Sequence, residues 1–345
     1  MCGIYGMYNY GNELRVEEAT SVIRNLGVES MTRGTDATGI AFVENGRVKI
    51  QKAAKKASRF EVQFTKPVRA VTGHTRQTTQ GNHRYNQNNH PFYGRAGGVS
   101  FALAHNGIIW NDDRLRVKYR LPKTQIKTDS YAAVQLLEKS GKVTAETIKT
   151  MVEQLEGVYC FTILDSRSRL YLVKGTNPMA VLHDRVMKAY FYASTREILL
   201  AGLSKSLLVG KLNEHLNDDR SSVELLEPTD GSILTLEPDG TMKRSKFEVK
   251  AEYYGRYGMF CDIDDDMKYG SYSPYTPSSR ESYSSEQKKY IEHLQNIAVY
   301  LGFDEVIVDE LLAEGFTLDE IEQYLYDFDD GCVSGYYEEE KAMKI

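Results

Sequence analysis

Residues 2–10, CGIYGMYNY, place a cysteine directly ahead of a run that alternates in polarity and is rich in β-forming residues. Such a run predicts a strand close to the N-terminus. Residues 39–53, GIAFVENGRVKIQKA, predict two strands joined by an Asn-Gly turn, which is a strong hairpin signal. The strand–turn–strand pattern recurs at 159–175, 180–195 and 232–249. Much of the chain up to residue 250 is therefore expected in antiparallel sheets.

Three other segments of this region show the spacing of apolar side chains that is typical of amphipathic helices. They are residues 16–31, 128–140 and 144–157. The last two begin at Thr128 and Thr144, and threonine is suited to the helix N-cap. Several hairpins combined with a few amphipathic helices favour an α+β fold in which helices cover antiparallel sheets.

A change of composition near residue 251 divides the chain. Residues 1–250 carry 36 basic and 26 acidic side chains, a net charge of +10, whereas residues 251–345 carry 7 basic and 22 acidic ones, a net charge of −15. Residues 251–285 are dense in Tyr, Ser, Gly and Asp without periodicity, which predicts a flexible linker. Residues 286–345 contain helical patterns, the later of them broken at Gly315. We therefore predict a domain, a linker and a small acidic helical region.

Several classes of protein are not expected. No apolar run of the 345 residues approaches the ~20 needed to span a bilayer. The N-terminal segment has no basic region followed by an apolar core, so we expect no signal peptide and a cytoplasmic protein. The four cysteines are far apart and the histidines lack metal-ligand spacing, which predicts no disulfide framework, no metal site and no cofactor. Cys160, within VYCFTIL, is expected to be a buried structural thiol.

Cys2 follows Met1, and its small side chain favours removal of that methionine. The new N-terminal residue would carry both a thiol and a free α-amine, which can serve as the general base directly or through one water. The pKa of a free α-amine is about 8, close to that of a base working at neutral pH. A cysteine at position 2 can equally be an accident of sequence, so this hypothesis depends on the residues downstream.

Five segments of the first 130 residues support the hypothesis by their order. They are MCGIYG (1–6), RGTDATGIAF (33–42), GHTRQTTQGNHRYNQNNHPF (73–92), ALAHNGIIWNDDRLR (102–116) and KTDS (127–130). Together they resemble the glutaminase domain of class II glutamine amidotransferases, and most nearly that of glucosamine-6-phosphate synthase. The likeness continues to about residue 205, and weakly to 250. It implies a four-layer αββα sandwich of the N-terminal-nucleophile type, with Cys2 at the end of a central strand.

The resemblance also implies roles for single residues. Cys2 matches the nucleophile, while the side-chain amide of Asn106 and the backbone N–H of Gly107 match the oxyanion hole, whose donors stabilise the developing negative charge. Arg76 matches the arginine that binds the α-carboxylate of glutamine, because a fork of donors suits a carboxylate. Asp129 matches the partner of the α-ammonium. The last two together would select a free amino acid over a glutamine within a peptide.

Three further residues match positions close to the substrate: Thr79 and His90 near the glutamine, and Arg33 beside the N-terminal strand. Two residues depart from the pattern. Gln77 stands where the synthase usually has an aromatic residue that helps to close the glutamine loop, and Gln80 replaces a common histidine. The nucleophile and the oxyanion hole are intact, so we expect looser loop closure and ammonia transfer, or their control by another protein.

Taken singly, several of these residues also have purely structural interpretations. Asn106-Gly107 is a usual type I′ turn sequence, and Asp129 suits the first turn of a helix. His90, before a proline, suits a packed loop, and Arg33 suits a surface ion pair.

The sequence thus predicts a glutamine amidotransferase subunit that hydrolyses glutamine to glutamate and ammonia through a thioester on Cys2. About 95 residues cannot hold sugar-isomerase domains, and no phosphate-binding loop follows residue 130, so we expect the synthase that accepts ammonia on another chain. Two alternatives are an N-terminal-nucleophile amidase acting on another amide and an inactive binding protein of the same fold. A nucleic-acid partner is a weaker expectation, based only on the +10 charge, and no membrane partner is expected.

Overall fold

The computed structural model describes residues 2–250, 283–300 and 307–313, and positions 317, 318, 321, 322 and 325. The chain divides into two compact units, Met1–Cys261 and Asp262–Ile345. Most of the predicted linker, residues 251–285, lies outside the described residues, as does the break expected at Gly315.

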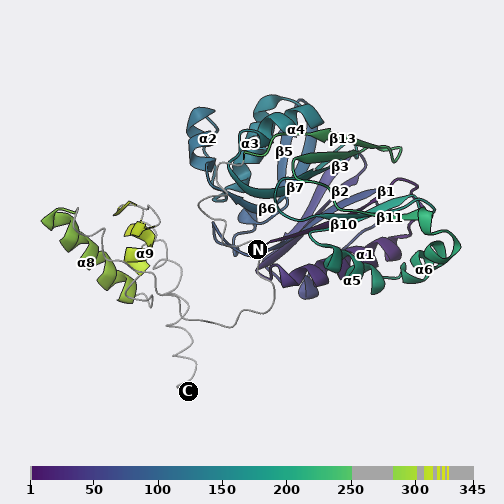
Figure 1. Ribbon diagram of the computed structural model, residues 1–345, viewed down its shortest axis with the longest axis horizontal. Coiled ribbons are helices and arrows are strands. Elements are labelled where there is room, and N and C mark those ends of the chain that lie inside the picture. Colours follow the sequence, from purple (N-terminus) through teal and green to yellow (C-terminus); the bar gives the residue numbers. More distant parts are fainter. Residues whose placement is uncertain are drawn as a thin grey trace, which may run out of the picture. The chain divides into compact units, whose positions relative to one another are not determined.

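A seven-stranded antiparallel sheet has the N-terminal strand β1 at its centre (Figure 1). The strand order is β11-β9-β10-β1-β4-β2-β3. Pairing on both sides of β1 is antiparallel, with Met7 opposite Phe191 of β10 and Val71 of β4. The strands are β1 (Gly3–Asn9), β2 (Ala37–Glu44), β3 (Arg47–Ala53), β4 (Ala70–Arg76), β9 (Ala180–Asp184), β10 (Ala189–Ala193) and β11 (Val223–Leu226).

The second sheet has six antiparallel strands in the order β13-β12-β8-β7-β6-β5. Its long central ladder joins β6 and β7, from Phe101 opposite Asp165 to Ile109 opposite Gly157. The strands are β5 (Phe92–Ala96), β6 (Val99–Ile109), β7 (Gly157–Asp165), β8 (Leu170–Lys174), β12 (Ser232–Leu236) and β13 (Met242–Lys246).

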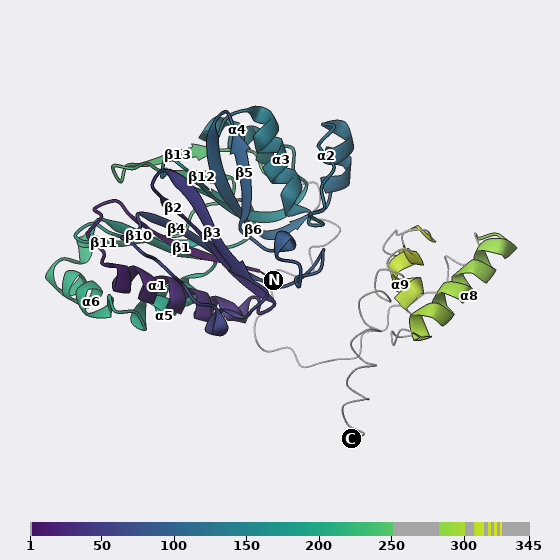
Figure 2. The ribbon, with the colours of Figure 1, turned by 180° about the vertical axis from the view of Figure 1, so that it is seen from behind.

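Helices cover the outer faces of the two sheets, which gives the αββα sandwich expected from the sequence. The helices α1 (Val16–Glu29), α5 (Arg196–Ser204) and α6 (Val209–Asp218) lie on the side of the first sheet. The helices α2 (Asp112–Lys118), α3 (Ser130–Ser140) and α4 (Ala145–Val152) lie on the side of the second, as the opposite view also shows (Figure 2). The predicted fold class is therefore confirmed.

The alternation of side chains along β1 shows that the first sheet lies between two apolar layers. Tyr5 and Met7 belong to the core between the first sheet and its helices, with Val22 and Leu26 of α1. Ile4 and Tyr8 instead join the core between the sheets. Successive side chains of a strand point to opposite faces, so every position of this central strand is buried. Cys2, two residues before Ile4, lies on the same face of the strand as Ile4, the face toward the second sheet.

The structure confirms two local signals in the sequence and contradicts a third. The turn at Asn45-Gly46 has positive φ angles at both residues, 51° and 68°, as a type I′ hairpin requires. The Thr144 side chain accepts from the N–H of Thr147 and caps α4. The assignment of Thr128 as an N-cap was wrong. Asp129 precedes α3 instead, and the buried hydroxyl of Thr128 has no hydrogen-bond partner.

The second unit contains the helices α8 (Ser285–Tyr300) and α9 (Ile307–Ala313). Buried side chains from these helices and the positions beyond them form a separate small cluster: Ile291, Leu294, Ala298, Val308, Ile321 and Leu325. Among the described residues of either unit, no helix has the length and apolar character needed to cross a membrane.

We expect residues 1–250 to fold alone, because every member of the three clusters that build the sandwich lies before residue 250. A chain ending at residue 250 should keep the far-UV circular dichroism per residue of a β-rich domain. Its thermal unfolding midpoint should lie within about 4 °C of that of the same transition in the full chain, the shift expected for a change of about 1 kcal/mol in a domain of this size.

A chain ending at residue 230 is the matched control. It lacks β12 and β13 and so removes the buried residues Ile233, Leu234 and Leu236, which should prevent cooperative unfolding. Failure of the 1–250 chain to fold would show that the second unit is an integral part of the sandwich.

Candidate active site

Pairing between β1 and β4 determines the surroundings of Cys2. Gly3 lies opposite Thr75, so the next residues outward, Cys2 and Arg76, face each other at the end of the sheet. The N–H of Gln77 donates to Cys2 Sγ at 3.4 Å, and the thiol donates to the Gln77 carbonyl oxygen at 3.3 Å. The cysteine is about nine-tenths buried and lies at the end of the central strand, where the sequence placed it.

A small cavity adjoins the Cys2 thiol. Its volume is about 10 Å³, which is room for about one water molecule. Residues from the ends of β1 and β4, from β6 and from the start of α3 line it. Six of the eight residues singled out in the sequence are among them: Cys2, Arg76, Thr79, His90, Gly107 and Asp129.

Arg76 closes the cavity from the β4 side. Its Nη1 donates to Asn89 Oδ1 at 2.7 Å, and its Nη2 donates to the carbonyl oxygens of Gln80 and, at 2.9 Å, Gly81. The guanidinium is thus bound to the loop that follows its own strand. Asp36 fixes the same loop, because its Oδ2 accepts from the N–H of Thr78 at 2.7 Å.

Asp129 lies on the opposite wall, at the start of α3. Its Oδ2 accepts from the N–H of Ile109 at 2.7 Å, and Ser130 Oγ donates to its Oδ1 at 3.2 Å. The side chain does not cap the helix, which argues against a purely local structural role. The N–H of Asp129 donates to Gln80 Oε1 at 3.1 Å, so Gln80 contacts both Arg76 and Asp129.

Asn106 and Gly107 lie within β6, so their interpretation as a turn is wrong. Gly107 has a φ of +141°, and a Cβ at this position would lie 1.9 Å from the carbonyl oxygen of Val158. Both observations require glycine. The side chain of Asn106 is fully buried, yet its Oδ1 has no hydrogen-bond partner and its Nδ2 makes a long 3.5 Å contact with Ser194 Oγ. Asn106 is not among the residues that line the cavity.

His90 packs within a group of buried aromatic rings while lining the cavity. Its ring lies 4.2 Å from that of His74 and 4.3 Å from that of Phe92, and neither ring nitrogen has a hydrogen-bond partner. Burial, followed by the neighbouring His74 and His105, holds the pKa of His90 well below its usual value, so the ring is neutral. Among the described residues no cluster of His, Cys, Asp and Glu could hold a metal ion.

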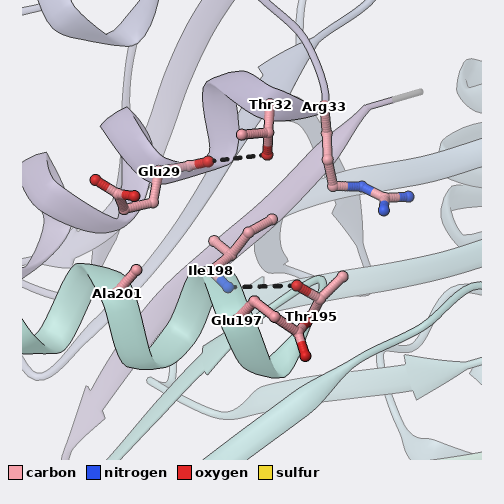
Figure 3. A pocket seen from close by; sticks show the side chains of 7 residues that line it. All are labelled: Glu29, Thr32, Arg33, Thr195, Glu197, Ile198 and Ala201. Carbon is pink, nitrogen blue, oxygen red and sulfur yellow. Dashed lines mark hydrogen bonds between the residues drawn. The ribbon is translucent and has the colours of Figure 1, made fainter. Parts of the chain in front are cut away.

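Arg33 lies outside the cavity and contacts the backbone of Cys2. Its Nε donates to the carbonyl oxygen of Cys2 at 2.8 Å. Arg33 also borders a surface hollow of about 390 Å³ between the end of α1 and the start of α5, where its side chain points away from Glu29 (Figure 3). The structure therefore places Arg33 as a support for the Cys2 backbone.

Burial is the main influence on the Cys2 thiol. It raises the pKa of the thiol above its usual value, while the Gln77 N–H and the Arg76 charge oppose this effect. The thiol is therefore protonated at neutral pH, and any reaction as a thiolate would require a base. Cys160 is completely buried, as expected, and burial raises the pKa of its thiol to about 12.

Sequence reasoning missed the residues that hold the site together. Asn89 accepts a hydrogen bond from Arg76 and positions its guanidinium. Ser194 Oγ accepts from the N–H of Ile4 and from the side-chain amide of Asn106. Asn177 Nδ2 donates to the carbonyl oxygen of Asn106. Asn177 lies within KGTNPMAV, a segment that the resemblance covered without marking this residue. These contacts join positions 13 to 190 residues apart, and no local pattern reveals them.

Comparison with known proteins bears on the domain and its fold. A family model described as a glutamine amidotransferase domain matches residues 74–201, a range that includes the end of β4, all of β6 and the start of α3 but not Cys2. The B. subtilis glutamine phosphoribosylpyrophosphate amidotransferase has a similar structure, with a TM-score of 0.55 and 22% identity over 72% of this chain and 49% of that one. The chain contains a class II glutamine amidotransferase domain. The structural likeness at this identity shows the shared fold.

Curated relatives of the amidotransferase domain are synthases and aminotransferases. The isomerizing glutamine–fructose-6-phosphate aminotransferase of Staphylococcus epidermidis is 31% identical over 193 residues, which are 52% of this chain and 30% of that protein. The 7-cyano-7-deazaguanine synthase of Saccharolobus solfataricus is 28% identical over 213 residues, 57% of this chain and 43% of that protein. The chain thus spans less than half the length of these relatives.

Gly107→Ala should destabilise the amidotransferase domain by about 3 kcal/mol or more, because the substitution adds an unfavourable φ to a clash with the Val158 carbonyl. Gly46→Ala is the matched control. Gly46 also has a positive φ, but nothing lies within 4 Å of a Cβ there, so only the backbone cost of about 1–2 kcal/mol applies. Urea unfolding measures both. Equal losses would contradict a tight contact at Gly107.

Proposed function

We propose that the chain hydrolyses glutamine to glutamate and ammonia, with Cys2 as the nucleophile after removal of Met1. One observation carries this proposal: the Cys2 thiol shares a buried cavity with Arg76, Asp129 and Gly107. Recognition of a free amino acid needs an anion and a cation, and thiol attack on its amide needs a donor for the resulting oxyanion. The cavity has a group for each of these tasks.

Substrate binding follows from the charges of the two walls. The guanidinium of Arg76 pairs with the α-carboxylate of glutamine, and the Asp129 carboxylate pairs with the α-ammonium. Arg76 must release the carbonyl oxygens of Gln80 and Gly81 as the substrate enters, so the loop after β4 moves with binding. An amidase for other amides would not need both charged groups, which favours glutamine.

The reaction begins when the α-amine of Cys2 takes the thiol proton. Sulfur attacks the amide carbon, and the carbonyl π electrons move to oxygen, whose negative charge meets the Gly107 N–H and the Asn106 amide. The protonated α-amine of Cys2 then gives its proton to the leaving nitrogen as the C–N bond breaks. This step releases ammonia and leaves a thioester on Cys2. Water attacks the thioester with the same base, the C–S bond breaks, and glutamate leaves with the thiol restored.

The ammonia passes to a synthase in this proposal. The relatives support this step, since their names describe an aminotransferase and a synthase with different products. The identity of the acceptor therefore does not follow from the amidotransferase domain. We place the acceptor on another chain, and we assign docking of that chain to the acidic region from residue 286 onward.

Replacement of the nucleophile is the direct test. Cys2→Ala should abolish glutamate release from glutamine, because the other described cysteine, Cys160, lies in the core with a thiol pKa raised to about 12. Cys160→Ala is the matched control and should keep the wild-type rate. Coupled glutamate dehydrogenase assays measure the release. Equal rates for wild type and Cys2→Ala would exclude the mechanism.

A chain that retains Met1 should also be inactive, since its Cys2 amine lies in a peptide bond. Mass spectrometry of the intact chain reports the state of the N-terminus.

The amino-acid clamp predicts a change of specificity. Asp129→Asn keeps an oxygen for the Ile109 N–H but loses the negative charge, so the preference for glutamine over Nα-acetylglutamine should fall by about 10- to 100-fold. Arg76→Lys should raise KM for glutamine with a smaller effect on kcat, because the bidentate contact is lost. Steady-state kinetics with both substrates measure these ratios. An unchanged preference in Asp129→Asn would favour an amidase for other amides.

A further inference from the structure

We propose that Asn177 is a positioning residue for the oxyanion hole: it fixes the orientation of the Asn106–Gly107 peptide, whose N–H meets the developing oxyanion. This inference rests on the proposed function. Its geometric basis is a 2.7 Å hydrogen bond from Asn177 Nδ2 to the carbonyl oxygen of Asn106.

The carbonyl and the N–H in question belong to one planar peptide group. In a trans peptide the two groups point in opposite directions, so an anchor on the Asn106 oxygen sets the direction of the Gly107 N–H. The donor reaches the peptide from the side away from its N–H. A bond to the carbonyl oxygen also polarises the peptide and makes its N–H a better donor.

Glycine at position 107 makes such an anchor necessary. Its φ of +141° and its close approach to the Val158 carbonyl exclude other residues, but glycine also gives a peptide unusual freedom to rotate. An oxyanion hole lowers the barrier only when its donors are aligned before charge develops. The Asn177 side chain supplies the restraint that residue 107 itself lacks.

The loop that carries Asn177 is held firmly enough to serve as this anchor. It joins β8 of one sheet to β9 of the other. The Lys174 ammonium, which is buried, donates to the carbonyl oxygens of Gly175 and Thr176 at 3.3 and 3.2 Å. The Thr176 N–H donates to the Tyr159 carbonyl oxygen at 3.2 Å, and Tyr159 lies opposite Gly107 in the β6–β7 ladder.

The test uses the full chain with three variants of Asn177. Asn177→Asp keeps the size of the side chain but replaces the donor with an acceptor, which cannot bond to the carbonyl oxygen of Asn106. Asn177→Ala removes the amide group. Asn177→Ser is a smaller polar alternative should the alanine variant fail to fold. We expect kcat for glutamine hydrolysis to fall by at least about 10-fold, but by less than the 10²–10³-fold that is typical when a donor is lost completely. The KM should change by less than about twofold. Asn111→Ala is the matched control. Its amide also bonds a backbone carbonyl, that of Gln154, at 2.9 Å, but away from the cavity, so kcat should stay unchanged.

A second readout separates alignment of the donor from general loss of structure. The γ-aldehyde analogue of glutamate adds the Cys2 thiol across its carbonyl: the S–C bond forms and the thiol proton goes to oxygen, which then occupies the oxyanion position. Its inhibition constant should rise by the same factor as kcat falls, whereas the dissociation constant of glutamate should not change. Asn177 variants that keep wild-type kcat and aldehyde affinity would overturn the inference. A Cys2→Ala chain that remains active would instead overturn the proposed function, whatever the Asn177 variants do.

Discussion

The antiparallel pairing of β1 with β4 is the constraint on which the site depends. It brings Cys2 opposite Arg76 at the end of the first sheet, and it lets the loop after β4 contact the thiol through Gln77. Both faces of β1 are buried, so a shift of register by one residue would exchange Ile4 and Tyr8 with Tyr5 and Met7 between two different cores. The same packing that stabilises the sandwich therefore also fixes the position of Cys2.

The second sheet supplies what the first cannot. Strand β6 continues past its pairing with β5, which ends at Leu103, and carries Asn106 and Gly107 toward the end of β1. Facing sheets thus contribute different chemistry: the thiol and the guanidinium come from one, and the backbone donor comes from the other. Asp129, at the start of α3, is attached to this second half by its bond to the Ile109 N–H.

Two identical dipeptides show where local prediction from the sequence succeeds and where it fails. Asn45-Gly46 and Asn106-Gly107 have the same letters, and local rules assign both to a hairpin turn. The first is such a turn, whereas the second lies within a strand. Only the order of five segments distinguished them. The fold followed from that order, and so did six of the residues that line the cavity. The partners of Arg76 and of the Asn106 carbonyl did not, because Asn89 and Asn177 are brought to them by tertiary structure alone.

The contacts of the Arg76 guanidinium have a consequence for affinity. Its three acceptors are supplied by the protein, so an incoming carboxylate competes with groups tethered nearby. The function proposed above therefore requires a second, open form in which the guanidinium has released these acceptors and can bind the carboxylate of glutamine. Apparent affinity is then the intrinsic affinity reduced by the open fraction. A docked protein that stabilises the open form would strengthen glutamine binding without touching glutamine, and glutamine would strengthen docking by the same factor.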